Sequence, residues 1–208
     1  IFNPAGDKAE ACGNGTRCVA KLLFNENKKN EINILSDAGV LNAIKKNNGF
    51  ISVNLGSLST DWKKIPLSKE INTLNIPIKI EGCTEGVAVN IGNPHVVFFG
   101  NNIDNIKLND IGPSIENNKL FKNKTNVEFV EIINTKKIKM RVWERGAGIT
   151  LACGSGACAA VYAGYIKNLL EKDVEVVLAR GSLFISIENH RAIMTGPAEI
   201  SFNGSIEI

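Results

Sequence analysis

Two short segments of this chain carry nearly the same sequence, and this internal repeat constrains the fold more than any other feature. Cys12 and Cys153 each stand between an alanine and a glycine, and a second glycine follows two residues after the first. A further cysteine comes soon after, at Cys18 and Cys158, and each copy runs into an apolar segment. Repetition of one element at long range is typical of chains built from similar units. The repeat therefore predicts two half-molecules that present one cysteine each to a shared site.

The apolar segment at 155–170 is the clearest helix in the sequence. It is apolar almost all round, from Ala157 to Leu170. A helix without a polar face must be buried on every side. The flanking sequence offers only strands to cover it, with candidates at 174–178, 183–187 and 191–194. We therefore expect a sheet that curls around one central helix.

The first copy of the repeat opens a shorter predicted helix at 16–25, with Val19, Leu22 and Leu23 on one face. Three candidate strands follow, at 32–35, 40–44 and 50–55, and an Asn-Asn-Gly turn marks a hairpin between the last two. These strands are too few to wrap a helix. We therefore expect this half to be incomplete at its N-terminal end, and we expect residues 198–208 to return and add a strand.

The alternation of apolar residues breaks down between Gly56 and Leu67, where we place a domain crossover. Further strands are predicted at 74–80, 86–91, 95–99, 127–133 and 138–143, with a helical turn after Pro113. The predicted fold is α+β, with two pseudo-symmetric domains that are each a curled mixed β-sheet around a central helix. The first domain is residues 1–56, to which 199–208 return, and the second is residues 57–198.

Composition excludes several classes of function. The net charge is only +3, and lysines are interspersed with asparagines rather than gathered in a basic stripe, so no nucleic-acid partner is expected. No apolar run approaches the roughly 20 residues that span a bilayer, so no membrane partner is expected either. Five cysteines and two histidines fit neither a disulfide framework nor a common zinc pattern. We expect no metal, free thiols and a cytoplasmic location.

The placement of the first cysteine of each copy, just before a helix, has a chemical consequence. Unpaired N–H groups and the helix dipole favour negative charge there, so we expect the helix start to lower the pKa of the Cys153 thiol. The same N–H groups form a site for a carboxylate or a phosphate, and the lysine of a phosphate loop is absent. A structural alternative remains, in which small residues only let a sheet pack closely on the helix start. Cys18 and Cys158 lie inside the helices, where we expect them to serve packing.

Two thiols beside two anion-binding helix starts favour one type of reaction. One thiolate removes a proton from the carbon next to a carboxylate, and the other thiol delivers a proton to the opposite face. The helix N–H groups stabilise the charge that develops on the carboxylate. The configuration of that carbon is inverted, with no pyridoxal phosphate or metal.

The sequence resembles the diaminopimelate epimerase family, enzymes of lysine and cell-wall precursor synthesis. The resemblance rests on seven blocks, which follow the family's order along the whole chain: Phe2–Gly6, Ala11–Cys18, Gly92–His95, Thr125–Phe129, Trp143–Gly148, Ala152–Gly156 and Gly196–Ala198. It implies a cofactor-independent isomerase that interconverts LL- and meso-2,6-diaminopimelate. It also implies a homodimer.

The resemblance assigns a role to individual residues. Cys12 and Cys153 are the two acid–base thiols, and His95 and Glu144 tune their pKa values. The α-carboxylate is bound by the backbone N–H groups of Gly13, Asn14, Gly154 and Ser155. The amino end and the distal end of the substrate are bound by Asn3, Asn93, Asn126, Glu144 and Arg145.

The chain departs from the family pattern at its start, where family members have a longer N-terminal region and Ala-Asp in place of Pro4-Ala5. Two other functions stay open. One is a related cysteine-pair enzyme, such as proline racemase or the isomerase of phenazine synthesis, although the Glu144-Arg145 pair favours a diamino dicarboxylic substrate. The other is a non-catalytic redox or metal-binding dithiol module.

Overall fold

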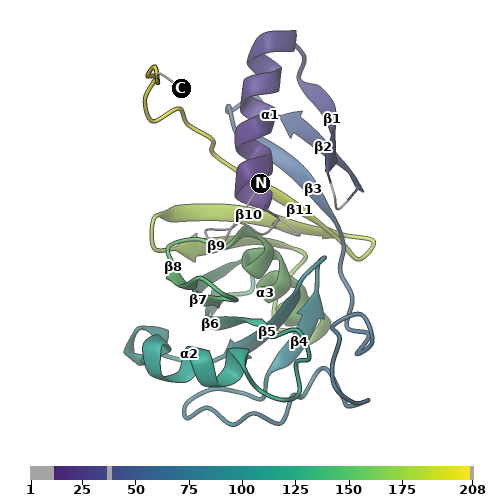
Figure 1. Ribbon diagram of the computed structural model, residues 1–208, viewed down its shortest axis with the longest axis vertical. Coiled ribbons are helices and arrows are strands. Elements are labelled where there is room, and N and C mark those ends of the chain that lie inside the picture. Colours follow the sequence, from purple (N-terminus) through teal and green to yellow (C-terminus); the bar gives the residue numbers. More distant parts are fainter. Residues whose placement is uncertain (1–11, 37–38, 207–208) are drawn as a thin grey trace.

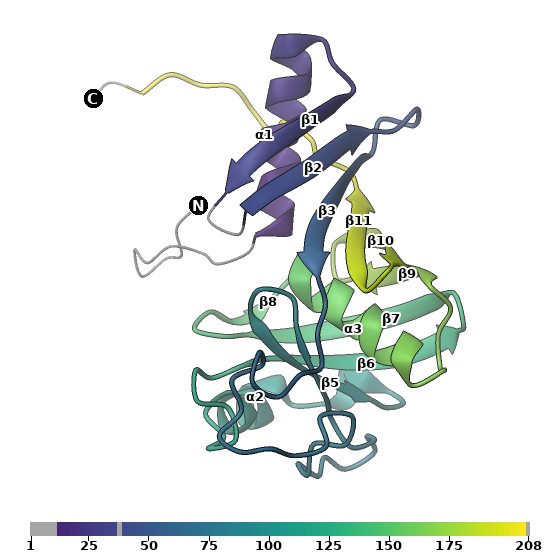
Figure 2. The same cartoon turned by 90° about the vertical axis from the view of Figure 1, so that its right-hand side faces the viewer.

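The computed structural model describes residues 12–36 and 39–206 (Figures 1 and 2). The helices in this part are α1 (Gly13–Asn27), α2 (Leu108–Glu116), α3 (Gly154–Ile166) and a 3-10 turn at Ile103–Asn105. The strands are β1 (Glu31–Ser36), β2 (Gly39–Lys45), β3 (Ile51–Ser57), β4 (Val87–Asn90), β5 (Pro94–Phe99), β6 (Asn126–Asn134), β7 (Lys137–Glu144), β8 (Gly148–Thr150), β9 (Asp173–Leu178), β10 (Gly181–Glu188) and β11 (Arg191–Gly196). This alternation of helices with a mixed sheet confirms the predicted α+β class.

All the strands belong to one sheet, in the order β1-β2-β3-β11-β10-β9-β7-β6-β5-β4, with β8 attached to β7. Neighbouring strands are antiparallel except for the pairs β5–β6 and β7–β9, which are parallel. The pairing of β3 with β11 carries the sheet without a break from the α1 end of the molecule to the α3 end (Figure 2).

Helix α3 lies inside the curl of the sheet, as predicted. Every residue from Gly154 to Gly164 is buried, because β4, β5, β6, β9, β10 and β11 all pack against the helix. The helix ends at Ile166, earlier than the predicted end at Leu170. Two residues later Asn168 adopts a left-handed conformation with φ of 57°, which does not continue a helix. A helix that is apolar on all sides can be stable only in such an enclosure.

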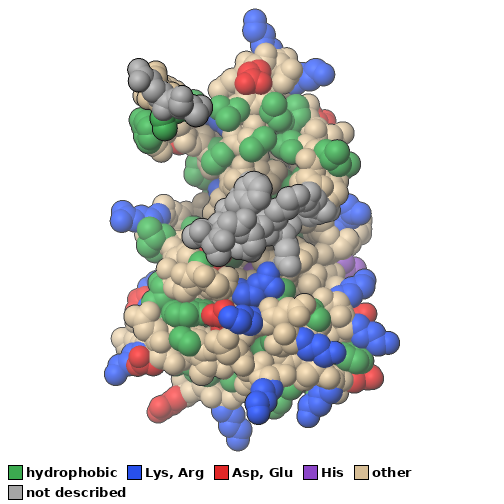
Figure 3. All heavy atoms as spheres, in the orientation of Figure 1, with side chains coloured by type: hydrophobic (Ala, Val, Ile, Leu, Met, Phe, Trp, Pro, Cys, Tyr) green, Lys and Arg blue, Asp and Glu red, His purple; other side chains and the backbone are tan. Residues whose placement is uncertain are grey.

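Helix α1 covers the sheet formed by β1, β2 and β3 with a different face from the one predicted. Its buried side chains include Ala20 and Phe24, whereas Val19 and Leu22 are 39% and 53% exposed. The prediction for this face was wrong because Thr16 and Arg17 are buried along with Ala20. Figure 3 shows apolar side chains gathered over this end of the molecule.

Other predicted elements also differ from the structure. Residues 74–80 form no strand and contribute only an isolated bridge between Ile76 and Gly86. Residues 197–206 contain no strand, although Ala198 packs in the same cluster as Ala20 of α1. Helix α2 starts at Leu108 and includes Pro113 rather than following it. Within the described residues, no helix is long and apolar enough to span a membrane.

Candidate active site

The first cysteine of each copy of the internal repeat is the residue immediately before a helix. Cys12 precedes α1, and its Sγ accepts the backbone N–H of Gly15 at 3.4 Å. Cys153 precedes α3 with an extended backbone, and its Sγ lies 3.5 Å from the hydroxyl of Ser155. The two thiols therefore stand beside helix starts, where N–H groups are free to bind an anion.

The two helix starts lie against a common neighbour, Met194 of β11. A Cβ placed on Gly13 would be 2.5 Å from the terminal methyl of Met194, and one placed on Gly154 would be 2.9 Å from its sulfur. The same position on Gly154 would be 3.3 Å from Oδ1 of Asn14. Both glycines thus leave room for the side chain of Met194 between the starts of α1 and α3, and the repeat does bring its two copies together.

Asn14 has an unsatisfied polar atom at this junction. Its Oδ1 is buried and has no hydrogen-bond partner among the described residues. Buried polar atoms almost always have a partner, so Oδ1 of Asn14 is available to accept a hydrogen bond from a ligand or a water molecule. Asn14 also borders a cavity of about 120 Å³ lined by Arg17, Ala152, Leu178, Arg180, Gly181, Ser182, Leu183 and Pro197.

The thiol of Cys153 is buried, with 5% exposure, and carboxylates surround it. Burial raises its pKa well above the ordinary value, and the negative charges of Glu144 and Glu128 raise it further. The hydroxyl of Ser155 and the N–H of Gly156 oppose this only in part. The expectation that the helix start lowers this pKa was therefore wrong, because loss of hydration and two nearby carboxylates outweigh the helix dipole.

His95 is fully buried and is held from both sides of its ring. Its Nδ1 lies 2.7 Å from Oε1 of Glu128, and its Nε2 lies 2.9 Å from Oδ1 of Asn93. Glu128 is a site residue that was not predicted from the sequence. The signal was present, since a carboxylate interrupts the apolar run from Val127 to Val130, and buried carboxylates are rare unless they are paired.

Asn126, Glu144 and Arg145 meet where β6 begins and β7 ends. Asn126 accepts the backbone N–H of Arg145 at 2.9 Å and donates to the carbonyl of Pro94 at 2.9 Å. The guanidinium of Arg145 donates to the carbonyl of Asn123 at 3.2 Å, and Glu144 accepts a hydrogen bond from the hydroxyl of Thr150. These contacts join the turn before His95 to the turn after Glu144.

The structure thus connects most of the predicted site residues through shared neighbours. Asn3 is the exception, since it lies outside the described residues. His95 contacts Glu128 rather than either thiol in the contacts that the structure describes. Cys158 is buried in α3 as expected, but Cys18 is exposed, so the packing role predicted for Cys18 was wrong. Between residues 12 and 206, apart from 37–38, no three His, Cys, Asp or Glu side chains are grouped to hold a metal ion.

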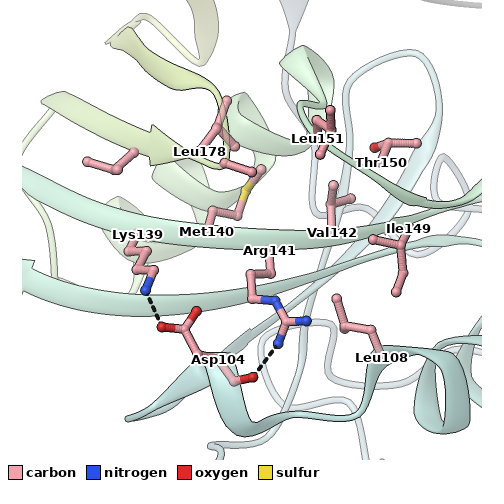
Figure 4. Close-up of a pocket in the computed structure, with 12 residues that line it drawn as sticks. Asp104, Leu108, Lys139, Met140, Arg141, Val142, Ile149, Thr150, Leu151 and Leu178 are labelled. Atoms are coloured by element: carbon pink, nitrogen blue, oxygen red, sulfur yellow. Dashed lines mark hydrogen bonds and ion pairs between the residues drawn. The ribbon is translucent and has the colours of Figure 1, made fainter.

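A second, mainly apolar pocket lies on β7, β8 and β9 and contains none of the predicted site residues (Figure 4). It measures about 190 Å³. Asp104 at its edge pairs with Lys139, and its backbone carbonyl accepts from Arg141 at 3.0 Å. Two of its lining residues connect it to the site: Thr150 hydrogen-bonds to Glu144, and Leu178 also lines the cavity beside Asn14.

Comparison with known proteins agrees with this arrangement. The model of the diaminopimelate epimerase family matches residues 87–201. The diaminopimelate epimerase of Pelagibacter ubique (strain HTCC1062) is 43% identical over 214 residues, covering 100% of this chain and 78% of that protein. The diaminopimelate epimerase of Carboxydothermus hydrogenoformans is 45% identical, covering 98% of this chain and 76% of that protein.

A solved structure shares the fold at much lower sequence identity. It is a phenazine biosynthesis PhzC/PhzF protein from Clostridium difficile (strain 630), with a TM-score of 0.65 and 13% identity. The match covers 100% of this chain and 77% of that one. At this identity the likeness concerns the fold alone.

Proposed function

Because the chain belongs to the diaminopimelate epimerase family, we propose that it interconverts LL- and meso-2,6-diaminopimelate with Cys12 and Cys153 as the two acid–base thiols. The observation that carries this proposal is the placement of both cysteines before adjacent helix starts. One cysteine before a helix is compatible with a purely structural role. Two cysteines at adjacent helix starts can act on the two faces of one carbon.

The reaction consists of two proton transfers. The thiolate of one cysteine takes the proton from the α-carbon, so that a C–H bond breaks and an S–H bond forms. The thiol of the other cysteine then gives its proton to the opposite face of the same carbon, which restores a C–H bond and leaves a thiolate. The surroundings of Cys153 hold it as a thiol, which is the form that donates.

The α-carboxylate is bound by backbone N–H groups at the two helix starts. The N–H groups of Gly13, Asn14, Gly154 and Ser155 are in the first turns of α1 and α3, where they have no partner within the helix. Negative charge spreads from the α-carbon onto the carboxylate as the proton leaves. Donors already in place stabilise that charge without rearrangement, which lowers the barrier.

Polar residues bind the two ends of the substrate: Glu144 and Arg145 hold the reacting amino end, and the distal end is bound by the Arg145 guanidinium together with Asn3, Asn93 and Asn126. Support for this grouping comes from the hydrogen bond between Asn126 and Arg145 and from the link between Asn126 and Pro94. A guanidinium is suited to a carboxylate because its N–H groups can bind both oxygens. Proline has no distal carboxylate, so this group of residues favours diaminopimelate over proline.

The cellular setting is part of the same proposal. All five cysteines are free, which fits a reducing compartment, the cytoplasm. We also infer a homodimer, as membership of the family implies. Sedimentation equilibrium at several protein concentrations tests the dimer, and a mass equal to one chain throughout would contradict it.

Hydrogen–deuterium exchange tests the proposed reaction. LL-diaminopimelate incubated with the protein in D2O and a reducing agent, without added cofactor, should acquire α-deuterium and yield the meso isomer. Cys12→Ala and Cys153→Ala should each lower epimerisation by at least about 10²-fold, the range of a general acid–base group. Cys18→Ala, which removes an exposed thiol from the same helix, is the matched control and should keep full activity. Two results would contradict the proposal. One is α-deuterium exchange that persists when Cys12→Ala and Cys153→Ala are combined, and the other is a protein that racemises proline and not diaminopimelate.

A further inference from the structure

Glu128 is the most unusual buried group in the site. It has no solvent exposure, and it sits in β6 between Val127 and Phe129, which are also fully buried. One oxygen, Oε1, lies 2.7 Å from Nδ1 of His95. The other, Oε2, is buried without a partner among the described residues.

The parallel pairing of β5 with β6 explains why Glu128 meets His95. His95 is the register partner of Asn126, and Glu128 is two residues further along the same strand. Residues two apart on a strand point to the same face of the sheet. Glu128, Asn126 and His95 therefore share the face that looks toward α3.

Gly156 lets the carboxylate lie against the first turn of α3. A Cβ on Gly156 would stand 2.7 Å from Oε1 of Glu128 and 3.3 Å from Sγ of Cys153. The carboxylate and the thiol thus lie on either side of the space that a Gly156 side chain would occupy. Any residue other than glycine would fill the space through which the charge of Glu128 acts on Cys153.

The charges around this carboxylate come from three sides. His95 contacts it from β5, the Cys153 thiol faces it from the start of α3, and Glu144 acts on it from the end of β7. Both nitrogens of the His95 ring face oxygen atoms, on Glu128 and on Asn93. The ring is therefore held in one orientation by a contact at each nitrogen. Burial raises the pKa of Glu128, and the contact with His95 opposes that rise.

We propose that Glu128 is a positioning residue of the two-thiol reaction, which fixes the ring of His95 and keeps Cys153 in the protonated form that donates to the substrate. This inference rests on the proposed function. A structural role for Glu128 explains less, because its second oxygen has no partner within residues 12–36 and 39–206, and an unpaired buried oxygen costs stability. The carboxylate is placed where its charge reaches a thiol.

The pH dependence of Cys153 alkylation tests this role directly. The full chain is treated with iodoacetamide between pH 6 and 11, and modification of each cysteine is followed by peptide mass spectrometry. In Glu128→Gln the amide keeps the size of the side chain and removes its charge. The midpoint for Cys153 should then move to lower pH by about one pH unit, the scale on which a neighbouring charge shifts a buried group.

Glu116→Gln is the matched control, because Glu116 is also a buried carboxylate, 5% exposed, but it contacts Trp143 and Gly146. In Glu116→Gln, the pH midpoint of Cys153 alkylation should equal that of the unchanged protein. If Glu128→Gln is folded by circular dichroism and also leaves the midpoint unchanged, the inference is wrong.

A second measurement does not depend on how well Glu128→Gln folds. The chain has two histidines, and the other one, His190, is exposed and hydrogen-bonds to Tyr162. His190 has a positive φ of 57°, which asparagine tolerates, so His190→Asn leaves His95 as the only imidazole. Proton–nitrogen NMR should show a ring N–H signal of His95 in water, because the hydrogen bonds and burial of the ring protect that proton from exchange. A ring that shows no N–H signal in water would contradict the hydrogen bonds that fix it to Glu128 and Asn93.

Neither readout requires turnover, so the two proposals fail separately. A protein that shows the shifted midpoint but no α-deuterium exchange refutes only the epimerase reaction. A protein that exchanges the α-proton but has the same Cys153 midpoint with and without Glu128 refutes only the role of Glu128.

Discussion

The side-chain oxygen of Asn126 accepts the backbone N–H of Arg145 at 2.9 Å, and this bond connects the sequence blocks Thr125–Phe129 and Trp143–Gly148. The amide group of the same side chain donates to the carbonyl of Pro94 at 2.9 Å. Asn126 is 4% exposed, so both bonds are shielded from water. It therefore holds the turn before His95 at a fixed distance from the turn that carries Arg145.

Replacing Asn126 should loosen substrate binding and the fold together. Asn126→Ala leaves the N–H of Arg145 and the carbonyl of Pro94 without their partner, and one unsatisfied buried group costs about 1–3 kcal/mol. We expect the free energy of unfolding to fall by about 2 kcal/mol, and KM for diaminopimelate to rise more than kcat falls. Urea unfolding and steady-state kinetics measure the two effects.

The control for this prediction is Asn123→Ala. Asn123 contacts Arg145 only through its backbone carbonyl in the bond at 3.2 Å, which an alanine retains. Equal losses of stability in the two variants would show that the side chain of Asn126 does not act as the link described above.

Parts of this fold could be predicted because the sequence signal is local and strong. Helix α3 has no polar face, so its burial on all sides followed from its composition. The position of Cys12 and Cys153 before two helices followed from the repeat and from the glycines after each cysteine. Short strands with clear turns between them, such as β2 and β3, were also predicted within a few residues.

Other parts depend on contacts between distant segments, which one sequence does not reveal. The buried face of α1 includes Arg17, which donates to the carbonyl of Pro197 and to the sulfur of Met194. Helical periodicity of apolar residues could not indicate this, since it assigns a charged residue to the surface. The pKa of Cys153 was predicted in the wrong direction for the same reason, because distant segments bury the thiol and also place Glu144 and Glu128 near it.

The contact between Gly13 and Met194 gives a second prediction. A methyl group at Gly13 would lie 2.5 Å from Cε of Met194 and 2.9 Å from Cδ1 of Leu55, so the ends of these two side chains, or the helix start itself, must shift. Gly13→Ala should lower the free energy of unfolding by about 1–3 kcal/mol. Met194→Ala should cost about 2–5 kcal/mol, because it leaves a cavity.

The double variant distinguishes crowding from a general effect of the alanine. Removing Met194 makes room for the new methyl group, so the combined loss of stability should be smaller than the sum by about 0.5–3 kcal/mol. Gly204→Ala is the control, since its Cβ would meet only the ring of Phe202 at 3.9 Å. Strict additivity of the two changes would rule out direct contact as the cause.

The packing of α2 on Trp143 gives a third prediction. A Cβ on Gly112 would stand 2.6 Å from atoms of the indole ring, which is also fixed by a hydrogen bond of 2.7 Å from Nε1 to Glu116. A rigid ring cannot yield as a flexible chain does, so Gly112→Ala should displace α2 and cost about 1–3 kcal/mol. Urea unfolding reports the change, and so does the emission maximum of Trp143 when both proteins also carry Trp62→Phe, which removes the other tryptophan. Ser114→Ala, at an exposed position of α2, should remain within about 0.5 kcal/mol of the unchanged protein.

The fourth prediction concerns stability at alkaline pH. Cys158 is fully buried in α3, and burial raises its pKa from about 9 to about 12, although the charge of Arg17 lowers it in part. The unfolded chain gives up this proton near pH 9, whereas the folded chain keeps it until about pH 12. The unfolded state therefore binds fewer protons in this window, and the free energy of unfolding falls as pH rises through it.

Cys158→Ala removes this titration, so its free energy of unfolding should fall less steeply between pH 9 and pH 11 than that of the unchanged protein. Below pH 9 the two curves should run parallel, with the variant lower by about 1 kcal/mol for the lost sulfur contacts. Cys18→Ala, which removes an exposed thiol, should follow the unchanged protein throughout. Urea unfolding at half-unit steps of pH measures all three. Identical slopes for Cys158→Ala and the unchanged protein above pH 9 would mean that Cys158 loses its proton equally easily in both states, and that α3 is less completely enclosed than its burial indicates.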